Sequence, residues 1–338
     1  DQYLNYEFPI ELRENTYSTF TIQRNCSLKC KVTGSGTLEY KIPFVREYVS
    51  GDWSGFYGTL VANGVNSDKD GSQLMLYNSG IPNASINLKG NARVTHWNPN
   101  VTIKLGGLSG DKGTYLGGTT KKTTGQTVTW QVGNANTNET FNGVIDRRGS
   151  ASGYNCNVNI VKEGSGYWRL TGSNTYNGTT IVTGGRLIID GSNQGTGLMT
   201  IKENGSLSGK GTIAGNVVVS GSVQADLSAS GSCQPLTIKG KLTANNATLV
   251  INMEDVTGTI ADDTEIKVFN LASAIQGTGF TDILPATPSA TQLWDTSLLA
   301  TKGIIKVVSN VANGISTPSA NNTSSSAIYD LTGKKTSS

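Results

Sequence analysis

Acidic side chains are the residues of this chain best suited to acid-base chemistry, and they are sparse. Clustered carboxylates on a β scaffold can bind Ca²⁺ or act as an acid and base pair on a polysaccharide, often with a lysine or arginine base. The candidates are Asp52, Asp111, Asp146 with Arg147 and Arg148, Asp190, Asp226, Glu254 with Asp255, and Asp262 with Asp263 and Glu265. None recurs at a spacing that would stack several carboxylates on one face. The pattern predicts solvated turn residues and no catalytic residue.

One short segment could hold a metal ion. Asp68 and Asp70 in "SDKDGSQ" form half of an oxygen-rich Ca²⁺ loop. The bidentate Glu that should end such a loop is missing, so a hairpin turn is predicted, with Ca²⁺ at Asp68 and Asp70 as the alternative. His96 is the only histidine, which leaves little material for zinc sites or Ser-His-Asp triads. No cofactor is predicted.

Exposed aromatic side chains are the remaining functional signal. Trp and Tyr rings are flat platforms for sugar rings, which have an apolar C–H face and polar edges. Trp130 and Trp168 alternate with aliphatic neighbours and are predicted to fill the interior. The predicted surface contacts for a ligand are Trp53, Trp97, His96 and Asn98.

Composition excludes several classes of protein. Of 338 residues, 42 are Gly, 15% are charged and 36% are hydrophobic, so a thick two-sided core is not expected. The net charge is +3, from 27 basic and 24 acidic residues spread along the chain, which argues against a nucleic-acid partner. No run of about 20 apolar residues exists, so no membrane span is predicted. The first residues lack a signal-peptide pattern, and we expect a removed signal or a longer parent chain.

Three of the cysteines are predicted to be buried free thiols. Cys26 and Cys30 share one side of a strand, where residues four apart are separated by about 13 Å. That is too far for a disulfide, whose Cα atoms lie within about 7 Å. Cys156 has the phase of the aliphatic residues that follow it, and a bond from Cys156 to a distant partner is the alternative.

Strand-forming segments follow one another along nearly the whole chain. Short alternating runs such as residues 8–12 and 249–253 are separated by Gly, Asn and Ser clusters. Three stretches, which begin at Asp52, Asn136 and Ser173, each place an aromatic residue two positions before a Gly and then an aliphatic strand. This imperfect repeat indicates one repeated structural unit.

A coil of short strands explains both the repeat and the low hydrophobic content. In a parallel β-helix, Gly and Asn form the corners because they tolerate positive φ, and inward side chains stack about 4.8 Å apart on successive turns. Its narrow core needs few large apolar residues. At roughly 20 to 25 residues per turn, the chain would make about a dozen turns and a rod of about 60 Å.

Residues 162–191, "KEGSGYWRLTGSNTYNGTTIVTGGRLIIDG", resemble the autotransporter-associated β-strand repeat. The matching positions are Lys162, Gly164, Gly166, Trp168, Leu170, Gly172, Asn174, Tyr176, Gly178 and Thr180. The stretches that follow are similar to the turns that succeed this repeat in passenger-type β-helices. The resemblance covers about residues 34–255. It implies an all-β, right-handed parallel β-helix, a pectin-lyase-like β-solenoid, in a secreted or surface-exposed bacterial protein.

The C-terminal segment carries a second resemblance. Residues 324–335, "SSSAIYDLTGKK", are similar to the start of the C-terminal sorting segments of Bacteroidetes secreted proteins, truncated before the later strands. Residues 311–338 are thus predicted to be a Ser-, Asn- and Pro-rich linker followed by that start. Residues 1–310 are predicted to be one β-helix, with an N-terminal cap at about 1–33 and less regular turns at about 256–310.

The sequence therefore predicts a non-catalytic extracellular module of a bacterial surface or secreted protein. It would act as a scaffold or as an adhesive surface whose partner is a polysaccharide or cell-surface glycan. One alternative is a polysaccharide lyase or glycosidase that acts on pectin-like polymers. The other is a structural protein that self-associates through the open ends of the coil, where unpaired backbone groups can pair.

Overall fold

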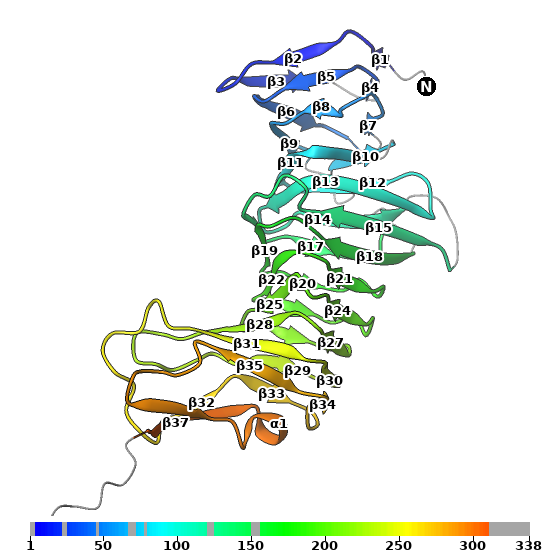
Figure 1. Cartoon of the computed structure of the whole chain (residues 1–338). Helices are drawn as coiled ribbons and strands as arrows, with labels where there is room; N and C mark the ends of the chain where they lie inside the picture. Colours follow the sequence, from blue (N-terminus) through cyan, green and yellow to red (C-terminus); the bar gives the residue numbers. More distant parts are fainter. Residues whose placement is uncertain are drawn as a thin grey trace, which may run out of the picture.

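The chain folds into an elongated coil of β-strands (Figure 1). The computed structural model describes residues 4–21, 26–44, 47–66, 72–77, 80–119, 125–149 and 156–310. Strands of successive turns pair in parallel. Over the described residues they make twelve turns, from β1, β2 and β3 to β33, β34 and β35. The predicted parallel β-helix and its dozen turns are confirmed.

Three columns of strands run along the coil. The first column contains β1 (Leu4–Tyr6), β4 (Cys26–Leu28), β7 (Glu47–Val49), β10 (Ser72–Leu76), β12 (Ala92–His96), β14 (Tyr115–Thr119), β17 (Val144–Ile145), β20 (Ser173–Asn174), β23 (Ser192–Asn193), β26 (Thr212–Ile213), β29 (Leu236–Ile238) and β33 (Phe269–Leu271). The second contains β2 (Ile10–Leu12), β5 (Val32–Gly34), β8 (Gly55–Phe56), β15 (Thr127–Val132), β18 (Asn157–Lys162), β21 (Thr180–Val182), β24 (Met199–Ile201), β27 (Val217–Val219), β30 (Leu242–Ala244) and β34 (Gln276–Gly277). The third contains β3 (Tyr17–Thr21), β6 (Thr37–Ile42), β9 (Thr59–Gly64), β11 (Gly80–Gly90), β13 (Val101–Gly110), β16 (Glu139–Phe141), β19 (Tyr167–Leu170), β22 (Gly185–Ile189), β25 (Gly205–Ser208), β28 (Ser222–Asp226), β31 (Ala247–Asn252) and β35 (Phe280–Leu284).

The core is a set of stacked inward positions. In β18 the side chains of Val158, Ile160 and Lys162 are buried, and those between them are half exposed, as the two-residue period of a strand requires. The long strands β11 and β13 begin in the second column and end in the third. One buried stack along the second column contains Ile103, Trp130, Ile160, Thr180, Met199, Val217 and Leu242. Each turn thus buries its inner face against its two neighbours, which is how a chain with few large apolar residues stays ordered.

Lys162 is a charged residue in the neighbouring, otherwise aliphatic stack. It pairs in register with Val132 on one side and Val182 on the other, and it is 1% exposed. Its Nζ donates hydrogen bonds to the carbonyl oxygens of Glu163, Gly164 and Gly184, at 2.6, 3.3 and 3.2 Å. The ammonium therefore joins the corners of two successive turns.

The titration of Lys162 should be visible in the stability of the protein. Burial lowers the pKa of Lys162 to about 8 from 10.5, opposed by the charge of Glu163. The unfolded chain keeps this proton up to about pH 10.5 and the folded chain releases it above about pH 8. The unfolded state therefore binds more protons in this window, and the free energy of unfolding should rise with pH.

The measurement compares urea denaturation of the wild type and Lys162→Met from pH 8 to 10.5. We expect the wild type to gain up to about 3 kcal/mol relative to the variant across this range. Other groups titrate in both proteins, so the difference between them isolates Lys162. Parallel pH dependences of the two proteins would contradict the prediction.

Corners of the coil use Asn and Gly where the sequence pattern placed them. Asn136 has a φ of 59°, and its Oδ1 accepts a hydrogen bond from the backbone N–H of Ser165 in the next turn, at 2.8 Å. Gly164 has a φ of 72°, and a Cβ there would lie 2.0 Å from the carbonyl oxygen of Gly133. Only glycine fits such a close approach between corners.

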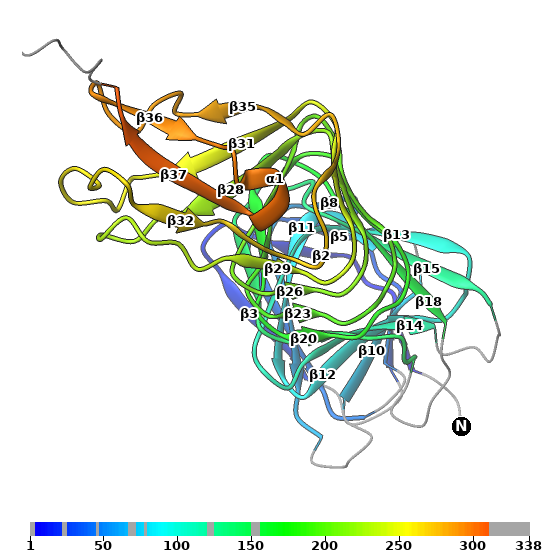
Figure 2. The same cartoon turned by 90° about the horizontal axis from the view of Figure 1, so that it is seen from below.

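The two ends of the described chain differ. Within the predicted cap at about 1–33, the described strands β1, β2 and β3 pair in parallel with β4, β5 and β6, as the strands of later turns do. Residues 256–310 add one last parallel turn. They also add an antiparallel sheet of β32 (Glu265–Lys267), β37 (Ile304–Ser309) and β36 (Gln292–Asp295), with the short helix α1 (Leu299–Lys302). This sheet projects from one side of the coil when the rod is viewed along its axis (Figure 2). Residues 311–338 and their sorting-type resemblance lie outside the described residues.

All four cysteines are free thiols, as predicted for three of them. Cys26, Cys30 and Cys156 are buried and Cys233 is half buried. Burial raises the pKa of Cys26 and of Cys233 to about 11, so these thiols stay protonated and unreactive near neutral pH. In the part of the chain that the structure describes, no helix is long and apolar enough to cross a membrane.

Candidate functional site

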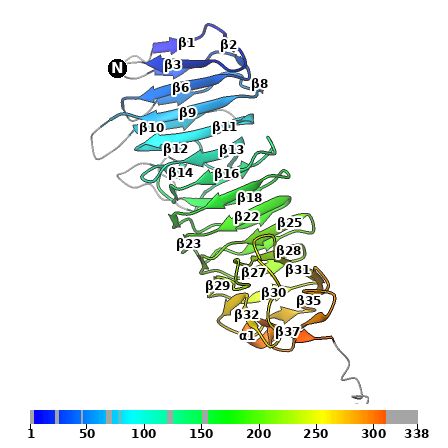
Figure 3. The ribbon, with the colours of Figure 1, turned by 90° about the vertical axis from the view of Figure 1, so that its left-hand side faces the viewer.

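A groove crosses the outer face of the first five strands of the first column. Its volume is about 350 Å³, and we call it the aromatic groove. Its lining residues are Asn5, Ser27, Lys29, Tyr48, Ser50, Tyr77 and Trp97. The strands that carry it lie in successive turns near the N-terminal end of the rod; all five are labelled in Figure 1, and β1, β10 and β12 can be followed in Figure 3.

The parallel register lines these side chains up. Leu28, Val49, Leu76 and His96 pair with one another in that order across β4, β7, β10 and β12. The residue after each of them is Lys29, Ser50, Tyr77 and Trp97, respectively. These four residues therefore form one row along the rod, with a spacing of about 4.8 Å per turn. Asn5, Ser27 and Tyr48 form a parallel row two residues back along each strand.

The aromatic rings are partly exposed and held in place. Tyr77 is 45% exposed, and Tyr48 and Trp97 are half buried. The rings of Tyr48 and Tyr77 meet edge to face, with centroids 5.8 Å apart and planes at 74°. The carbonyl oxygen of Trp97 accepts a hydrogen bond from Thr119 Oγ1 at 2.6 Å, which ties the Trp97 turn to β14. The groove thus offers three rings and one exposed ammonium, that of Lys29, to a ligand.

One of the four predicted ligand contacts lines the groove, and the other three do not. Trp97 lines the groove, whereas the expected surface exposure of Trp53 and His96 is wrong. Trp53 is 1% exposed, because a tight turn folds its indole onto Phe56, with ring centroids 5.7 Å apart. His96 is 3% exposed. Its inward phase in β12 buries it, and its Nδ1 accepts a hydrogen bond from the Asn98 backbone N–H at 3.0 Å. Asn98 is half buried and shapes the turn rather than the groove.

Sequence patterns missed the tyrosines and the lysine of the groove. Tyr77 directly follows Leu76, and Trp97 directly follows His96; Leu76 and His96 are the buried last residues of their strands. An aromatic residue directly after the buried end of a strand is a recognisable signal for this row of the groove. Asp68 and Asp70, the alternative Ca²⁺ ligands in a segment predicted to be a hairpin turn, lie outside the described residues. Over the residues that the structure describes, no cluster of three or more His, Cys, Asp or Glu could hold a metal ion.

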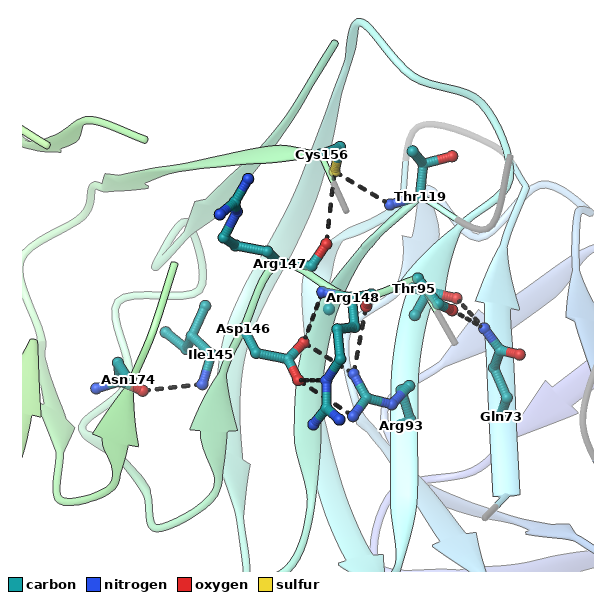
Figure 4. Close-up of polar contacts among 12 residues, drawn as sticks. Gln73, Arg93, Thr95, Thr119, Ile145, Asp146, Arg147, Arg148, Cys156 and Asn174 are labelled. Carbon is teal, nitrogen blue, oxygen red and sulfur yellow. Dashed lines mark hydrogen bonds and ion pairs between the residues drawn. The ribbon is translucent and has the colours of Figure 1, made fainter. Parts of the chain in front are cut away.

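A buried ion pair joins β12 to the segment after β17. Arg93 of β12 donates two hydrogen bonds to the Asp146 carboxylate, at 2.8 and 3.2 Å, and Arg148 Nε donates a third at 2.9 Å. The guanidinium of Arg93 also lies over the ring of Tyr115, 4.3 Å from its centroid. Figure 4 shows both arginines converging on this carboxylate. Asp146, a candidate acid-base residue in the sequence, is therefore fully engaged in holding the segment after β17 against the first column.

Three of the other acidic candidates lie together elsewhere. Asp190, Asp226 and Asp255 line a second groove of about 340 Å³ together with Arg169 and Lys210. The expectation that no carboxylates gather on one face is wrong for these three, because the coil brings together residues from turns of unequal length. Asp190 pairs with Arg169. Asp226 accepts hydrogen bonds from the side chains of Gln224 and Asn252, at 2.6 and 3.0 Å.

Comparison with known proteins places the coil in context. Residues 160–189, from β18 to β22, match the family model described as passenger-associated-transport-repeat. The chain is thus a β-helix that carries a repeat of the autotransporter passenger type, and the resemblance at 162–191 is confirmed. The similarity of the tail to Bacteroidetes sorting segments stays a prediction.

Two curated proteins are similar to part of the chain. One is the adhesin BmaC autotransporter of Brucella suis biovar 1, which is 41% identical over 101 residues, 28% of this chain and 3% of that protein. The other is the uncharacterized protein YuaQ of Escherichia coli strain K12, 37% identical over 109 residues, 31% of this chain and 7% of that protein. The matched stretches span less than a tenth of either relative.

Proposed function

We propose that this chain is a non-catalytic adhesive module of a bacterial surface or secreted protein, and that it contacts glycans through the aromatic groove. The observation that carries the proposal is the placement of Tyr48, Tyr77 and Trp97 on three successive turns, with their rings partly exposed. Aromatic faces bind the apolar face of a sugar ring. Lys29, in the same row as Tyr77 and Trp97, favours a sugar that carries a carboxylate.

The comparisons with known proteins support the surface role but not the choice of ligand. The repeat at 160–189 is of the passenger-associated type, and one relative is named as an adhesin and an autotransporter. Both favour a secreted or surface location. The glycan preference rests on the groove alone.

Replacing Trp97 by alanine should weaken binding of acidic oligosaccharides by about tenfold or more, as loss of a central aromatic contact usually does. The measurement is calorimetry or bead retention of the intact chain with uronic-acid oligosaccharides. Trp294→Ala is the matched control, because Trp294 is a half-buried tryptophan outside the groove. Equal binding by wild type and Trp97→Ala, or no retention of any acidic oligosaccharide, would refute the glycan role and favour a scaffold.

An enzyme is the second candidate, and the second groove supports it. Arg169 and Lys210 lie beside three aspartates there, which are residue types that a lyase uses as base and charge stabiliser. The partners that Asp190 and Asp226 already have favour a structural role. Incubation with pectin-like polymers decides between them, since new unsaturated ends would support an enzyme.

Self-association is the third candidate. The first described turn exposes Leu4, Phe8 and Tyr17 at 73%, 75% and 61%. Among the described strands, β1, β2 and β3 are each paired on one side only, and such edges favour end-to-end stacking. Sedimentation of the purified chain would reveal dimers or filaments.

A further inference from the structure

A third groove, which we call the polar groove, lies on the third column of strands. It has a volume of about 510 Å³ and runs from the turn at Tyr57, across β9 and β11, to the start of β16. Figure 3 shows β9, β11, β13 and β16 in successive turns along the rod. Ser85, Thr137 and Glu139 lie in its lining, which contains no basic residue.

Gly107 leaves room for three of the side chains that line this groove. Thr59, Ser85 and Gly107 pair in register across β9, β11 and β13. A Cβ on Gly107 would lie 2.5 Å from Ser85 Oγ, 2.8 Å from Glu139 Oε1 and 2.9 Å from Thr137 Oγ1. Three oxygens from three segments therefore converge where position 107 has no side chain.

The Glu139 carboxylate is half engaged. Its Oε1 accepts hydrogen bonds from Ser85 Oγ at 2.7 Å and from Thr137 Oγ1 at 3.0 Å. No described residue donates to Oε2, and no described cation forms an ion pair with Glu139. The side chain is half buried. Two hydroxyls thus fix the carboxylate while one of its oxygens keeps its full capacity to accept hydrogen bonds.

The rim of the groove is fixed as well. Asn134 Nδ2 donates to Asn83 Oδ1 at 3.0 Å and to the Pro82 carbonyl oxygen at 3.2 Å. Asn83 Nδ2 in turn donates to the Ser54 carbonyl oxygen at 2.8 Å. These bonds orient both amides without a ligand. Tyr57 adds an aromatic ring that is 65% exposed.

We propose that this polar groove is a separate binding site for a neutral hexose unit. A carboxylate oriented by its own hydrogen bonds can accept from sugar hydroxyls, the Asn and Ser groups can complete the polar contacts, and Tyr57 can stack on the ring. The uncompensated charge of Glu139 disfavours acidic sugars, which the aromatic groove with Lys29 favours. The two grooves lie on different columns, so one rod would contact two chemically different glycan units.

The test measures binding of neutral and of uronic-acid oligosaccharides separately on the intact chain. Glu139→Gln keeps the shape of the side chain and removes its charge, so we expect neutral-hexose affinity to fall about tenfold or more. Gly107→Ala should cause a similar loss, because its methyl group displaces the ends of three flexible side chains. Glu265→Gln, an exposed glutamate of β32, is the control.

Three results would overturn the proposal. One is the absence of neutral-oligosaccharide binding at millimolar concentration. Another is unchanged binding in both variants when circular dichroism shows them folded. The third is a preference for amino sugars over neutral hexoses, which would make Glu139 a counter-ion instead. Acidic oligosaccharides are measured in parallel. A failure of neutral-hexose binding therefore does not decide whether the aromatic groove binds acidic sugars.

Discussion

Replacing Asp146 by alanine is expected to lower the free energy of unfolding by about 3 to 5 kcal/mol, because it leaves a buried charge without its partner. The side chains of Arg93 and Asp146 are only 7% and 4% exposed. In the variant, the Arg93 guanidinium would keep the Arg148 carbonyl oxygen, at 3.3 Å, and the Tyr115 ring, but no carboxylate. Urea denaturation followed by circular dichroism measures the loss.

The control is Asp263→Asn, which breaks the ion pair of Asp263 with Lys306 and keeps a residue type that tolerates the φ of 65° at this position. The Asp263 side chain is 80% exposed, and pairs of this kind contribute about 0 to 1 kcal/mol. A loss below about 1 kcal/mol for Asp146→Ala, similar to that of the control, would show that water reaches Arg93 in the folded protein.

Asp146→Ala should also affect ligand binding in the aromatic groove. Arg93 pairs in register with Tyr115 at the start of β14, and Thr119 at the end of β14 holds the Trp97 carbonyl. Loosening this pairing frees the Trp97 turn, so Asp146→Ala should also weaken acidic-oligosaccharide binding, whereas Asp263→Asn should not. Stability and binding are thus two independent readouts of one buried carboxylate.

The coil was predictable from local chemistry, but the phase of individual strands was not. Glycine and asparagine corners between short aliphatic runs predicted the parallel β-helix and its dozen turns. In the repeat, Ile181 is the largest aliphatic residue of β21, yet it is half exposed, and its neighbours Thr180 and Val182 are buried instead. Thr180 can point inward because the Tyr176 hydroxyl lies 2.7 Å from its Oγ1. A hydrophobicity pattern cannot anticipate a polar pair that satisfies itself inside the coil.

The candidate site was predictable only in part, because turns differ in length. Val49 and Leu76, one turn apart, are separated by 27 positions, whereas Leu76 and His96 are separated by 20. Without the register, nothing in the sequence indicates that Tyr48 and Tyr77 accompany Trp97. Because turn lengths vary in this way, the sequence also did not indicate that Ser85 contacts Glu139, which lies 54 positions away.

Replacing Trp168 by alanine is the second large effect, an expected loss of about 3 to 5 kcal/mol in the free energy of unfolding. Trp168 is 1% exposed and pairs in register with Glu139 on one side and Leu187 on the other. Its indole Nε1–H donates to the Leu108 carbonyl oxygen at 2.9 Å. Leu108 lies in β13, two turns back. The Trp168 side chain therefore joins the passenger-type repeat to the turns that carry the aromatic groove and the polar groove.

The comparison variant is Trp294→Ala, which removes a half-buried indole from the antiparallel sheet and should cost less. Because Trp168 fills a stack position and bonds across β16, its loss should also separate unfolding into two steps, with the C-terminal turns melting apart from the N-terminal ones. In a coil whose turns contact only their neighbours, cooperativity depends on such interfaces. A single transition at the wild-type midpoint would show instead that the aliphatic stacks alone couple the two halves.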